Sequence, residues 1–398
     1  MKIFFLKTIF ILILSIILTF CSTSIEKQSK FLQNNTNLYW FSLNTNKKKI
    51  NENIDYYANR IFNECNARGM IMIVINKNHI IDRYYGETSP GNYQKPNQNS
   101  LIRIASISKL MTSEILIKLE QDKKLSITDT LQQHNYNNVK IPCIYNTPIR
   151  LYHLASHTSG LPREQPGGKY GRPVFTWPTK DNRWNWLKTV KLHSIPGKKA
   201  SYSNLAYDLL ADAMVQASKK PYSQLFKDYI TSPSNMKDTT YTPTKEQCSR
   251  LMKGTRSSSC NNTLAAAGSG GVYSTSTDIK KWMKNLLLKD KKIKNTISRK
   301  QNIYFLRKNL LEVKGMDIAG YADEIGLGWI YMKPQNKIPG IYQKTGGGGG
   351  FNTYIAIIPE ESIGIFVAIT RKDNTKFNKL IIFVNKLATL ISYKNKNI

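Results

Sequence analysis

Apolar segments of strand length stand near both ends of the chain, and their placement limits the fold more than any other feature. Residues 70–75 form the continuous apolar run Met-Ile-Met-Ile-Val-Ile, and residues 80–85 follow as a returning strand after a short Asn-Lys-Asn turn. Three more strand-like segments stand near the C-terminus, at residues 326–332, 352–358 and 363–370. Strands at both ends predict an antiparallel sheet closed by the two termini.

Helical patterns occupy the interval between those strands and also flank them. Apolar residues recur at helical spacing in five segments: residues 53–68, 106–119, 204–218, 278–288 and 376–391. We therefore expect an α+β fold, with an antiparallel sheet flanked by helices and an inserted helical subdomain. Residues 162–178 are rich in Pro, Gly and aromatic side chains, which is typical of a long loop that lines a site.

The N-terminus predicts export. Two lysines precede an apolar run, residues 8–20, which is too short to span a bilayer comfortably but has the length of a signal-peptide core. We expect residues 1–20 to be a signal peptide. The run ends in Leu-Thr-Phe-Cys21, which resembles the bacterial lipoprotein box, although Phe20 stands where that box has a small residue. An uncleaved membrane anchor is the alternative, and it also leaves the rest of the chain outside the cytoplasm.

The remaining chain divides into a tether and a folded body. Residues 21–53 are rich in Asn, Lys, Ser and Thr with little period, which predicts a polar tether. Residues 54–398 are expected to form one domain. We thus expect an exported monomer, either periplasmic or attached to a membrane through a lipid on Cys21.

The formal net charge of +32 raises the question of nucleic-acid binding. Lys and Asn are scattered along the whole chain, however, and no basic helix or arginine cluster concentrates the charge as binding in a groove requires. We therefore expect no nucleic-acid partner. A diffuse positive field instead favours anionic surroundings, such as a cell wall or a membrane surface.

Four cysteines besides Cys21 can pair if the protein is exported, namely Cys65, Cys143, Cys248 and Cys260. Cys248 and Cys260 bracket a short polar segment, so we expect them to pair first, although spacing alone does not establish a disulfide. The chain has no Cys-x-x-Cys, which argues against a thiolate metal site.

Ser106 and Lys109 form a Ser-x-x-Lys element at the expected start of a helix. Residues three apart lie on one helix face, one turn from each other. A serine hydroxyl is a weak nucleophile until a base takes its proton, and a neutral lysine with a lowered pKa can be that base. Alone, the pattern is weak, because a capping serine followed by an exposed lysine occurs in many helices.

Two further polar elements follow at a distance. Tyr202-Ser-Asn204 opens the helix expected at residues 204–218, where the phenol can shuttle protons and the amide can bind a substrate amide. Lys344-Thr-Gly346 precedes a strand, where a lysine and a hydroxyl can hold a carboxylate and a glycine lets a substrate backbone lie close. Each element alone also fits a cap or a packing role.

In this order, the three elements resemble the active-serine set of β-lactamases and penicillin-binding proteins. Tyr-Ser-Asn in second place is similar to the class C β-lactamases and to related D-alanyl-D-alanine carboxypeptidases and esterases. Two more segments carry the resemblance, Leu-Ala-Ser-His-Thr-Ser-Gly-Leu-Pro at residues 154–162 and Ala-Ala-Gly-Ser-Gly-Gly-Val-Tyr-Ser-Thr-Ser-Thr-Asp at residues 266–278. The similarity runs over residues 60–390 and implies a β-lactamase/transpeptidase-like fold.

The resemblance implies an exported serine hydrolase that forms an acyl-enzyme with β-lactam or peptidoglycan-like amides, without metal or organic cofactor. Ser106 is the implied nucleophile, and Lys109 and Tyr202 share the proton transfers, with the acylation base left open. The implied substrate-binding residues are Asn204, Lys344, Thr345 and Gly346. The implied oxyanion hole uses the backbone N–H groups of Ser106 and Gly347.

The substrate is the open point. Lys344 favours substrates with a carboxylate, hence peptidoglycan stems or β-lactams over neutral esters. Between these we expect a hydrolase of the class C β-lactamase type first. The alternatives are a D-alanyl-D-alanine carboxypeptidase or esterase of the same fold, or a penicillin-binding sensor without turnover. These differ in how fast water clears the acyl-enzyme.

Competing sites find little support. His153 and His157 are four apart, but the glutamate of His-Glu-x-x-His is missing, so we interpret both as satisfied polar histidines. No Gly-x-Ser-x-Gly elbow and no phosphate-binding glycine motif occurs. Three tryptophans at 177, 184 and 186 leave cleft lining and packing equally open.

The five glycines at residues 346–350 look at first like a linker. The first belongs to Lys-Thr-Gly, and the second offers the proposed oxyanion-hole donor. We expect Gly348 to Gly350 to form the turn into the strand near Phe351. With no bulky side chain in that turn, we also expect a cleft that is open on this side.

Overall fold

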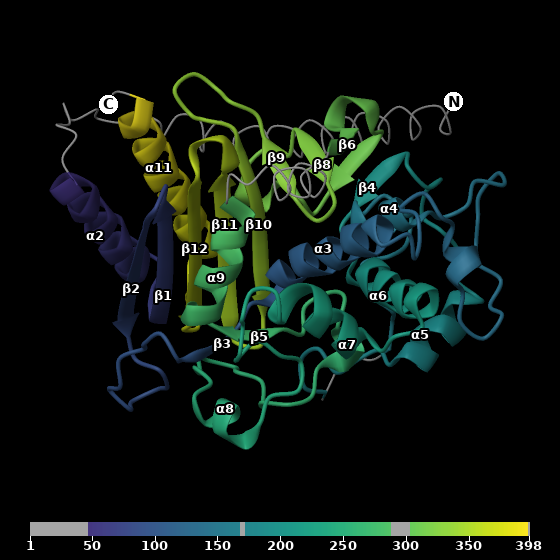
Figure 1. The fold of residues 1–398 in the computed structure, drawn as a ribbon, viewed down its shortest axis with the longest axis horizontal. Coiled ribbons are helices and arrows are strands. Elements are labelled where there is room, and N and C mark those ends of the chain that lie inside the picture. The colour runs from purple at the N-terminus through teal and green to yellow at the C-terminus, as the bar shows by residue number, and fades with distance from the viewer. Residues whose placement is uncertain (1–46, 168–171, 288–302, 397–398) are drawn as a thin grey trace, which may run out of the picture. The chain divides into compact units, whose positions relative to one another are not determined.

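The computed structural model describes residues 47–167, 172–287 and 303–396. Eight strands form a central sheet (Figure 1): β1 (Ala67–Asn76), β2 (His79–Gly86), β6 (Ile303–Leu306), β8 (Glu324–Gly326), β9 (Ile330–Met332), β10 (Ile341–Gly348), β11 (Phe351–Ile358) and β12 (Ile363–Arg371). Their order across the sheet is β2-β1-β12-β11-β10-β9-β8-β6, and every neighbouring pair is antiparallel. The first strands pair with the last one, so the predicted sheet closed by both ends is confirmed.

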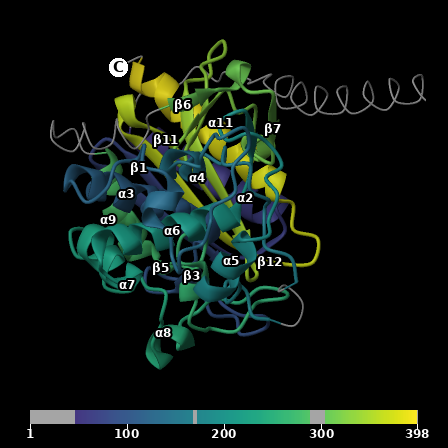
Figure 2. The same ribbon diagram turned by 90° about the vertical axis from the view of Figure 1, so that its right-hand side faces the viewer.

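The sheet has an apolar layer on each face. Alternate side chains of a strand point to opposite faces, and Met72 accordingly packs with α2 (Lys47–Glu64) and α11 (Phe377–Lys396). Its neighbour Ile73 packs on the other face, with the helical region that includes α9 (Ser276–Leu287). Figure 2 shows α9 on the opposite side of the sheet from α11. Burial on both faces explains why β1 is a continuous apolar run instead of an alternating one.

The chain between β2 and β6 forms the inserted helical region. Its other helices are α3 (Ser108–Gln121), α4 (Leu151–Ala155), α5 (Lys180–Leu187), α6 (Asn204–Ser218), α7 (Tyr222–Phe226) and α8 (Lys245–Ser249). Two small sheets accompany them, one of β3 (Leu101–Arg103) with β5 (Tyr273–Thr275) and one of β4 (Lys199–Ser201) with β7 (Glu312–Lys314). β3 leads directly into the turn before α3, which places the first candidate motif between the sheet and the helices (Figure 1).

The prediction of one strand at residues 326–332 was wrong, because two short strands, β8 and β9, lie there instead. β8 ends at Gly326 and β9 begins at Ile330, and the two pair as a hairpin. Gly328 has a φ of +78°, and a Cβ on it would lie 2.9 Å from the Tyr207 hydroxyl. The chain therefore turns at Gly328, where only a residue without a side chain fits.

The folded body begins earlier than the boundary expected at residue 54. Helix α2 starts at Lys47, inside the segment expected to be tether, and it buries Ile54 and Ile61 against the sheet. The signal peptide expected at residues 1–20, the lipidation expected at Cys21 and the tether up to residue 46 lie outside the described residues. Within the parts of the chain that the structure describes, no helix has the length and apolar character needed to cross a membrane.

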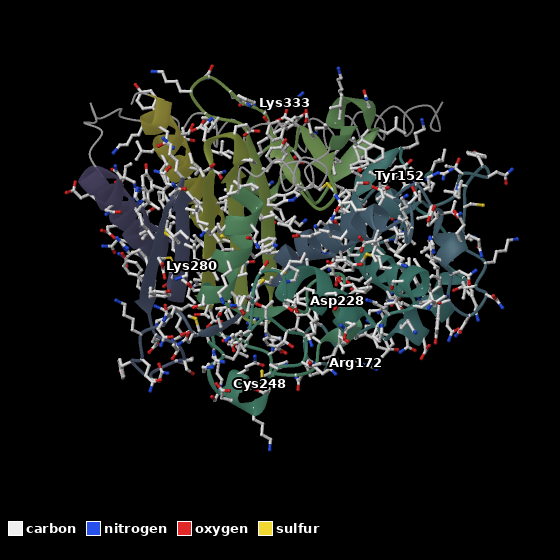
Figure 3. The ribbon with its side chains drawn as sticks, in the orientation of Figure 1. Tyr152, Arg172, Asp228, Cys248, Lys280 and Lys333 are labelled. Carbon is white, nitrogen blue, oxygen red and sulfur yellow. A yellow bond between two sulfur atoms is a disulfide. The ribbon has the colours of Figure 1, made fainter. Side chains whose placement is uncertain are left out.

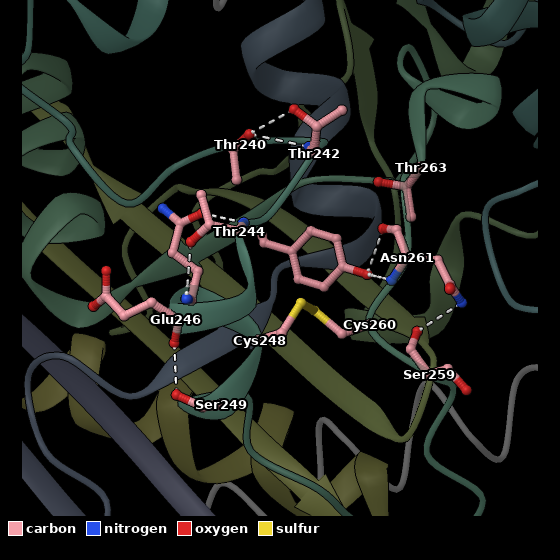
Figure 4. Close-up of a disulfide and its surroundings, with 12 residues drawn as sticks. Thr240, Thr242, Thr244, Glu246, Cys248, Ser249, Ser259, Cys260, Asn261 and Thr263 are labelled. Atoms are coloured by element: carbon pink, nitrogen blue, oxygen red, sulfur yellow. Dashed lines mark hydrogen bonds between the residues drawn. A yellow bond between two sulfur atoms is a disulfide. The ribbon is translucent and has the colours of Figure 1, made fainter.

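A disulfide joins Cys248, in α8, to Cys260 (Figure 4). Their Cα atoms are 5.7 Å apart, and 12 positions of sequence separate them. Cys65 is buried and Cys143 is exposed, and both are free thiols. Pairing of Cys248 with Cys260 fits an oxidising compartment.

Replacing both disulfide cysteines by serine should lower the free energy of unfolding by about 2–3 kcal/mol, because a loop of this length then regains its freedom in the unfolded chain. Urea unfolding of the oxidised protein and the double variant would measure this loss. Cys143→Ser is the matched control, for which a change within about 0.5 kcal/mol is expected at an exposed site. Equal stability of the double variant and the wild type would contradict a structural disulfide.

Candidate active site

Ser106 lies in a 3-10 turn, Ala105–Ile107, directly before α3. The sequence placed it at the start of the α-helix, but the α-helix begins two residues later, at Ser108. Ala105 has a φ of +48°, which is uncommon for a residue with a Cβ and costs energy. Backbone strain of this kind gathers at functional sites, and here it precedes the serine at the end of β3.

The Ser106 hydroxyl oxygen has two polar partners from distant parts of the chain. The Tyr202 hydroxyl donates to Ser106 Oγ at 2.7 Å. Lys109 Nζ donates to the same oxygen at 3.2 Å. A group that takes the serine proton must lie within hydrogen-bond reach, and both candidates do. The structure thus brings together the first two motifs, which stand 96 positions apart in the sequence.

Lys109 is buried, and its ammonium is held by two further acceptors. Lys109 Nζ donates to Asn204 Oδ1 at 2.6 Å and to the Ser269 carbonyl at 2.5 Å. Burial lowers the pKa of Lys109 to about 7, and the charge of Arg163 acts in the same direction. A lysine with this pKa is neutral in a large fraction of molecules near pH 7, and a neutral amine can accept a proton.

The Tyr202 ring is surrounded by cations. The ammonium nitrogens of Lys109 and Lys344 lie 5.0 Å and 4.6 Å from the ring centroid, and the Arg163 guanidinium lies 4.7 Å from it. The imidazole of His157 stacks on the ring at a centroid distance of 4.4 Å. Attraction of cations to an aromatic face holds the ring in place, with its hydroxyl directed at Ser106.

Strand β10 presents the third motif beside the serine. It pairs with β11 up to Gly348, but with β9 only at residues 341–343, so residues 344–348 leave one edge of the strand unpaired. A Cβ on Gly346 would lie 2.9 Å from the Ile104 carbonyl and 3.1 Å from the Ser106 nitrogen. Glycine at 346 therefore lets the open edge approach the serine, and an open strand edge can bind an extended peptide.

The motif side chains differ in exposure. Lys344 is buried, Thr345 is partly buried and Gly347 is exposed. Burial lowers the pKa of Lys344 to about 8, while the neighbouring Tyr202 acts in the opposite direction. Lys344 remains mostly protonated near pH 7, so it can still attract a carboxylate.

His157 departs from the interpretation of both histidines as satisfied polar groups, whereas His153 does not. His153 Nδ1 accepts from the Arg150 N–H at 3.1 Å, and burial lowers the pKa of His153 to about 4. His157 Nδ1 accepts from the Ser203 N–H at 3.1 Å, but its buried Nε2 has no partner among the residues that the structure describes. Burial and the charge of Lys344 hold the pKa of His157 well below its usual value. In the described ranges, no group of three or more His, Cys, Asp or Glu side chains is arranged to hold a metal ion.

The chain also matches a known protein family over most of its length. The family model described as Beta-lactamase matches residues 58–389 of the chain. The protein belongs to the β-lactamase family. Members of this family are serine hydrolases. The chain is therefore an enzyme of the serine hydrolase type, as its five motifs predict.

Three relatives of this β-lactamase-family protein match most of its length. It is 51% identical over 341 residues to the D-alanyl-D-alanine-carboxypeptidase/endopeptidase AmpH of Escherichia coli K12, which covers 85% of this chain and 89% of the relative. It is 54% identical to a β-lactamase/D-alanine carboxypeptidase of Yersinia pestis solved with citrate, with a TM-score of 0.85 over 87% of this chain and 99% of that one. A class C β-lactamase of Rhodobacter sphaeroides shares the fold, with a TM-score of 0.68 at 17% identity over 84% of this chain and 99% of that one.

Sequence reasoning missed two residues of the β-lactamase-family site. Ser269 supplies the carbonyl that holds Lys109, and its own N–H and hydroxyl donate to Asp208 at 2.9 Å and 3.1 Å. Burial raises the pKa of Asp208 to about 7. The segment that contains Ser269 was singled out for its resemblance, so the signal was present. A carbonyl contact leaves no trace in residue type, and Asp208 looks like an ordinary polar residue of a helix.

The turn of the glycine run packs against the long loop between α4 and α5. Gly349 and Gly350 connect β10 to β11 with φ values of +59° and +91°, as a tight hairpin turn requires. A Cβ on Gly348 would lie 2.8 Å from the Phe175 ring, and one on Gly349 would lie 2.9 Å from Val174. The glycines therefore let the long loop between α4 and α5 close over the end of β10.

Replacing Gly348 by alanine should lower the free energy of unfolding by about 1–3 kcal/mol and also alter substrate preference, because the new Cβ displaces the Phe175 ring. The φ of +155° at Gly348 adds backbone strain to this cost. Urea unfolding and a panel of acyl substrates would measure the two effects. The double variant with Phe175→Ala should recover part of the stability. An unchanged substrate profile in Gly348→Ala would contradict this prediction.

Proposed function

We propose that the protein is an exported active-serine D-alanyl-D-alanine carboxypeptidase and endopeptidase that acts on peptidoglycan-derived peptides. The observation that carries the proposal is the Ser106 hydroxyl held by Tyr202 and Lys109 beside the open edge of β10. The activity in the name of the Escherichia coli relative, at 51% identity, supports this choice. The sequence favoured a class C β-lactamase type first, and this relative favours the carboxypeptidase that was the alternative.

Acylation begins with Ser106. Its Oγ attacks the carbonyl carbon of the scissile amide, and its proton passes to Lys109 or through Tyr202. The C–N bond then breaks, the proton moves to the leaving amine, and an ester joins Ser106 to the acyl group. A water molecule later attacks this ester, which returns the proton to Ser106 and releases the acid.

Substrate binding uses the two sides of the serine. Lys344 and Thr345 bind the carboxylate of the leaving residue, and Asn204 orients the amide on the acyl side. Gly346 leaves room for the substrate backbone along the open strand edge. The N–H groups of Ser106 and Gly347 stabilise the oxyanion, and each such donor is typically worth about 3 kcal/mol.

The N-terminal pattern supports export. We propose that residues 1–20 are a signal peptide, that Cys21 carries a lipid, and that the polar residues up to 46 tether the domain outside the cytoplasm. The disulfide between Cys248 and Cys260 supports an oxidising location. Lipidation would be tested by mass spectrometry of the N-terminal peptide after expression in a bacterium, where an unmodified Cys21 would contradict it.

The substrate is tested with three compound classes on the same purified chain. D-alanine release from peptides ending in D-Ala-D-Ala, cleavage of a cross-linked peptide dimer, and hydrolysis of nitrocefin and short esters would be compared. We expect the peptides to be turned over fastest and β-lactams to leave a long-lived adduct on Ser106. Rapid β-lactam turnover without peptide cleavage would favour the class C type instead. No reaction or adduct with any compound would overturn the proposal.

A further inference from the structure

A cavity of about 710 Å³ adjoins the proposed active site. Asn204, Ser269 and Gly347 line it on the side of the catalytic groups. Four arginines from three segments of the chain also line it: Arg163, Arg172, Arg256 and Arg371. Arg163 and Arg172 belong to the long loop between α4 and α5, and Figure 3 labels Arg172. Arg256 belongs to the loop closed by the disulfide, and Arg371 ends β12.

Among the described residues, no carboxylate pairs with these four guanidinium groups. None of them forms an ion pair with any residue that the structure describes. The Nε atom of Arg371 is buried and lacks a hydrogen-bond partner in the described part of the chain. A buried polar group without a partner is uncommon unless a ligand or water completes it.

The two carboxylates that line the same cavity are already engaged. Glu164 accepts from the Asn204 amide, and Asp208 accepts from the backbone and the hydroxyl of Ser269. Neither carboxylate forms an ion pair with any of the four arginines in the part of the chain that the structure describes. Guanidinium groups bind carboxylates with strong charge-assisted hydrogen bonds, so this lining is suited to an anionic ligand.

The cavity lies on the acyl side of the serine. Lys344 and Thr345, which bind the leaving carboxylate in the proposed function, precede Gly346 on β10. The cavity begins at Gly347 and continues along Gly348 and Gly349. Each residue of a strand advances about 3.3 Å, so a peptide laid along this edge extends past the serine into the cavity on its acyl side.

We propose that this cavity is an anion subsite that selects substrates with an additional carboxylate on the acyl side of the scissile bond. The inference rests on the proposed function, because it assigns the acyl side from the placement of Ser106 and Lys344. The carboxylate belongs to a peptide residue near the scissile amide, and it binds the guanidinium groups of Arg256 and Arg371 together with those of Arg163 and Arg172.

The walls that carry the arginines are fixed to one another. Thr255 donates its N–H to the Arg371 carbonyl at 2.6 Å, which ties the disulfide loop to β12. Val174 donates its N–H to Ser258 Oγ at 3.0 Å, which ties the disulfide loop to the long loop. The Arg172 guanidinium lies over the Trp177 ring, 4.3 Å from its centroid. A preorganised lining loses little entropy when a ligand binds.

A pair of β-lactams that differ by one acyl-side carboxylate tests the subsite. Carbenicillin is benzylpenicillin with an added carboxylate on the side chain next to the acyl amide. The rate of adduct formation on Ser106 is measured for both by mass spectrometry at low salt. We expect carbenicillin to acylate the wild-type chain about tenfold faster than benzylpenicillin. A factor of about ten corresponds to the low end of the free energy that a hydrogen bond to a charged group contributes.

Variants of the cavity arginines test whether the preference for carbenicillin depends on this cavity. Arg256→Gln should lower the ratio of the two acylation rates, and Arg256→Lys, which keeps the charge, should lower it less. Arg256 is exposed, so its substitution should leave folding intact. Lys253→Gln removes the same charge from an exposed site in the same loop that does not line the cavity, and it should keep the wild-type ratio.

Salt provides a second measurement of the same charges. Raising the ionic strength from about 0.05 M to about 0.5 M should lower the ratio, because salt screens partly exposed charges. Equal rates for both compounds on the wild type would overturn the subsite while leaving the active serine intact. A ratio that survives in Arg256→Gln and Arg371→Gln would also overturn it. Absence of an adduct with both compounds would overturn the proposed function and this inference together.

Discussion

The Ser106→Ala variant is expected to form no acyl-enzyme and to lose about 10⁶-fold in kcat, as is typical when a serine nucleophile is removed. Ser106 Oγ is the atom to which both Tyr202 and Lys109 donate. The fold should persist, because the hydroxyl contributes two hydrogen bonds at the surface of the site. Intact-mass analysis after exposure to a β-lactam, together with D-alanine release, measures both losses.

Ser108→Ala is the matched control for this prediction. Ser108 stands two positions from Ser106, but its hydroxyl donates to the Ala105 carbonyl at 2.6 Å and is buried in the first turn of α3. The control should keep both adduct formation and turnover, with some loss of stability. An adduct that persists in Ser106→Ala, or disappears in Ser108→Ala while the protein stays folded, would refute the assignment of the nucleophile.

Replacing Lys109 by methionine should lower the acylation rate by about 10²–10⁴-fold, the usual contribution of a positioned general base. Methionine keeps most of the length and the apolar stem but removes the proton acceptor. The ammonium bonds to Asn204 and Ser269 disappear as well, so the substrate amide is also held less firmly. Pre-steady-state acylation measures the rate. Lys118→Met, on the same helix away from the site, should acylate at the wild-type rate.

The same residue predicts a pH profile. The pKa of Lys109 is lowered to about 7, so its neutral, proton-accepting fraction rises as pH increases through 7, and acylation should rise with it. The pKa of Lys344 is lowered to about 8, so its charge is lost above that pH, and acylation by substrates with a carboxylate should then fall. A bell-shaped profile is expected for such substrates, and only the acid limb for a neutral ester. A profile without an acid limb, with chemistry rate-limiting, would remove Lys109 from the role of base.

The site could be predicted to the level of motifs because its chemistry depends on residue types at short spacing. Ser106 and Lys109 are one helical turn apart, so their contact follows from local geometry. Tyr202 and Lys344 were joined to them only by resemblance to a family, since nothing in their own segments requires them to meet. The roles assigned to these residues remain predictions until the variants are measured.

Other features depended on contacts that residue types do not encode. The carbonyl of Ser269 and the guanidinium groups around the cavity meet because distant loops fold over one another. The glycine run illustrates the difference, because its composition suggested an open turn, whereas Phe175 and Val174 pack against it. The start of α2 at Lys47 was missed for a similar reason, since a helix of low hydrophobicity is stabilised there by the face it buries on the sheet.

The sequence by itself determined the α+β class, the sheet shared by both ends of the chain, and the motifs from which the candidate site is proposed. Periodicity and local motifs carry that information, because they depend on neighbours along the chain. Only the tertiary structure decided that Lys109 is buried enough to have its pKa lowered and that the edge of β10 is open beside Ser106. It also decided that one cavity is lined by four arginines that form no ion pair with any described residue. Burial and charge are set by groups that packing brings from far along the chain, so they exist only in the folded protein.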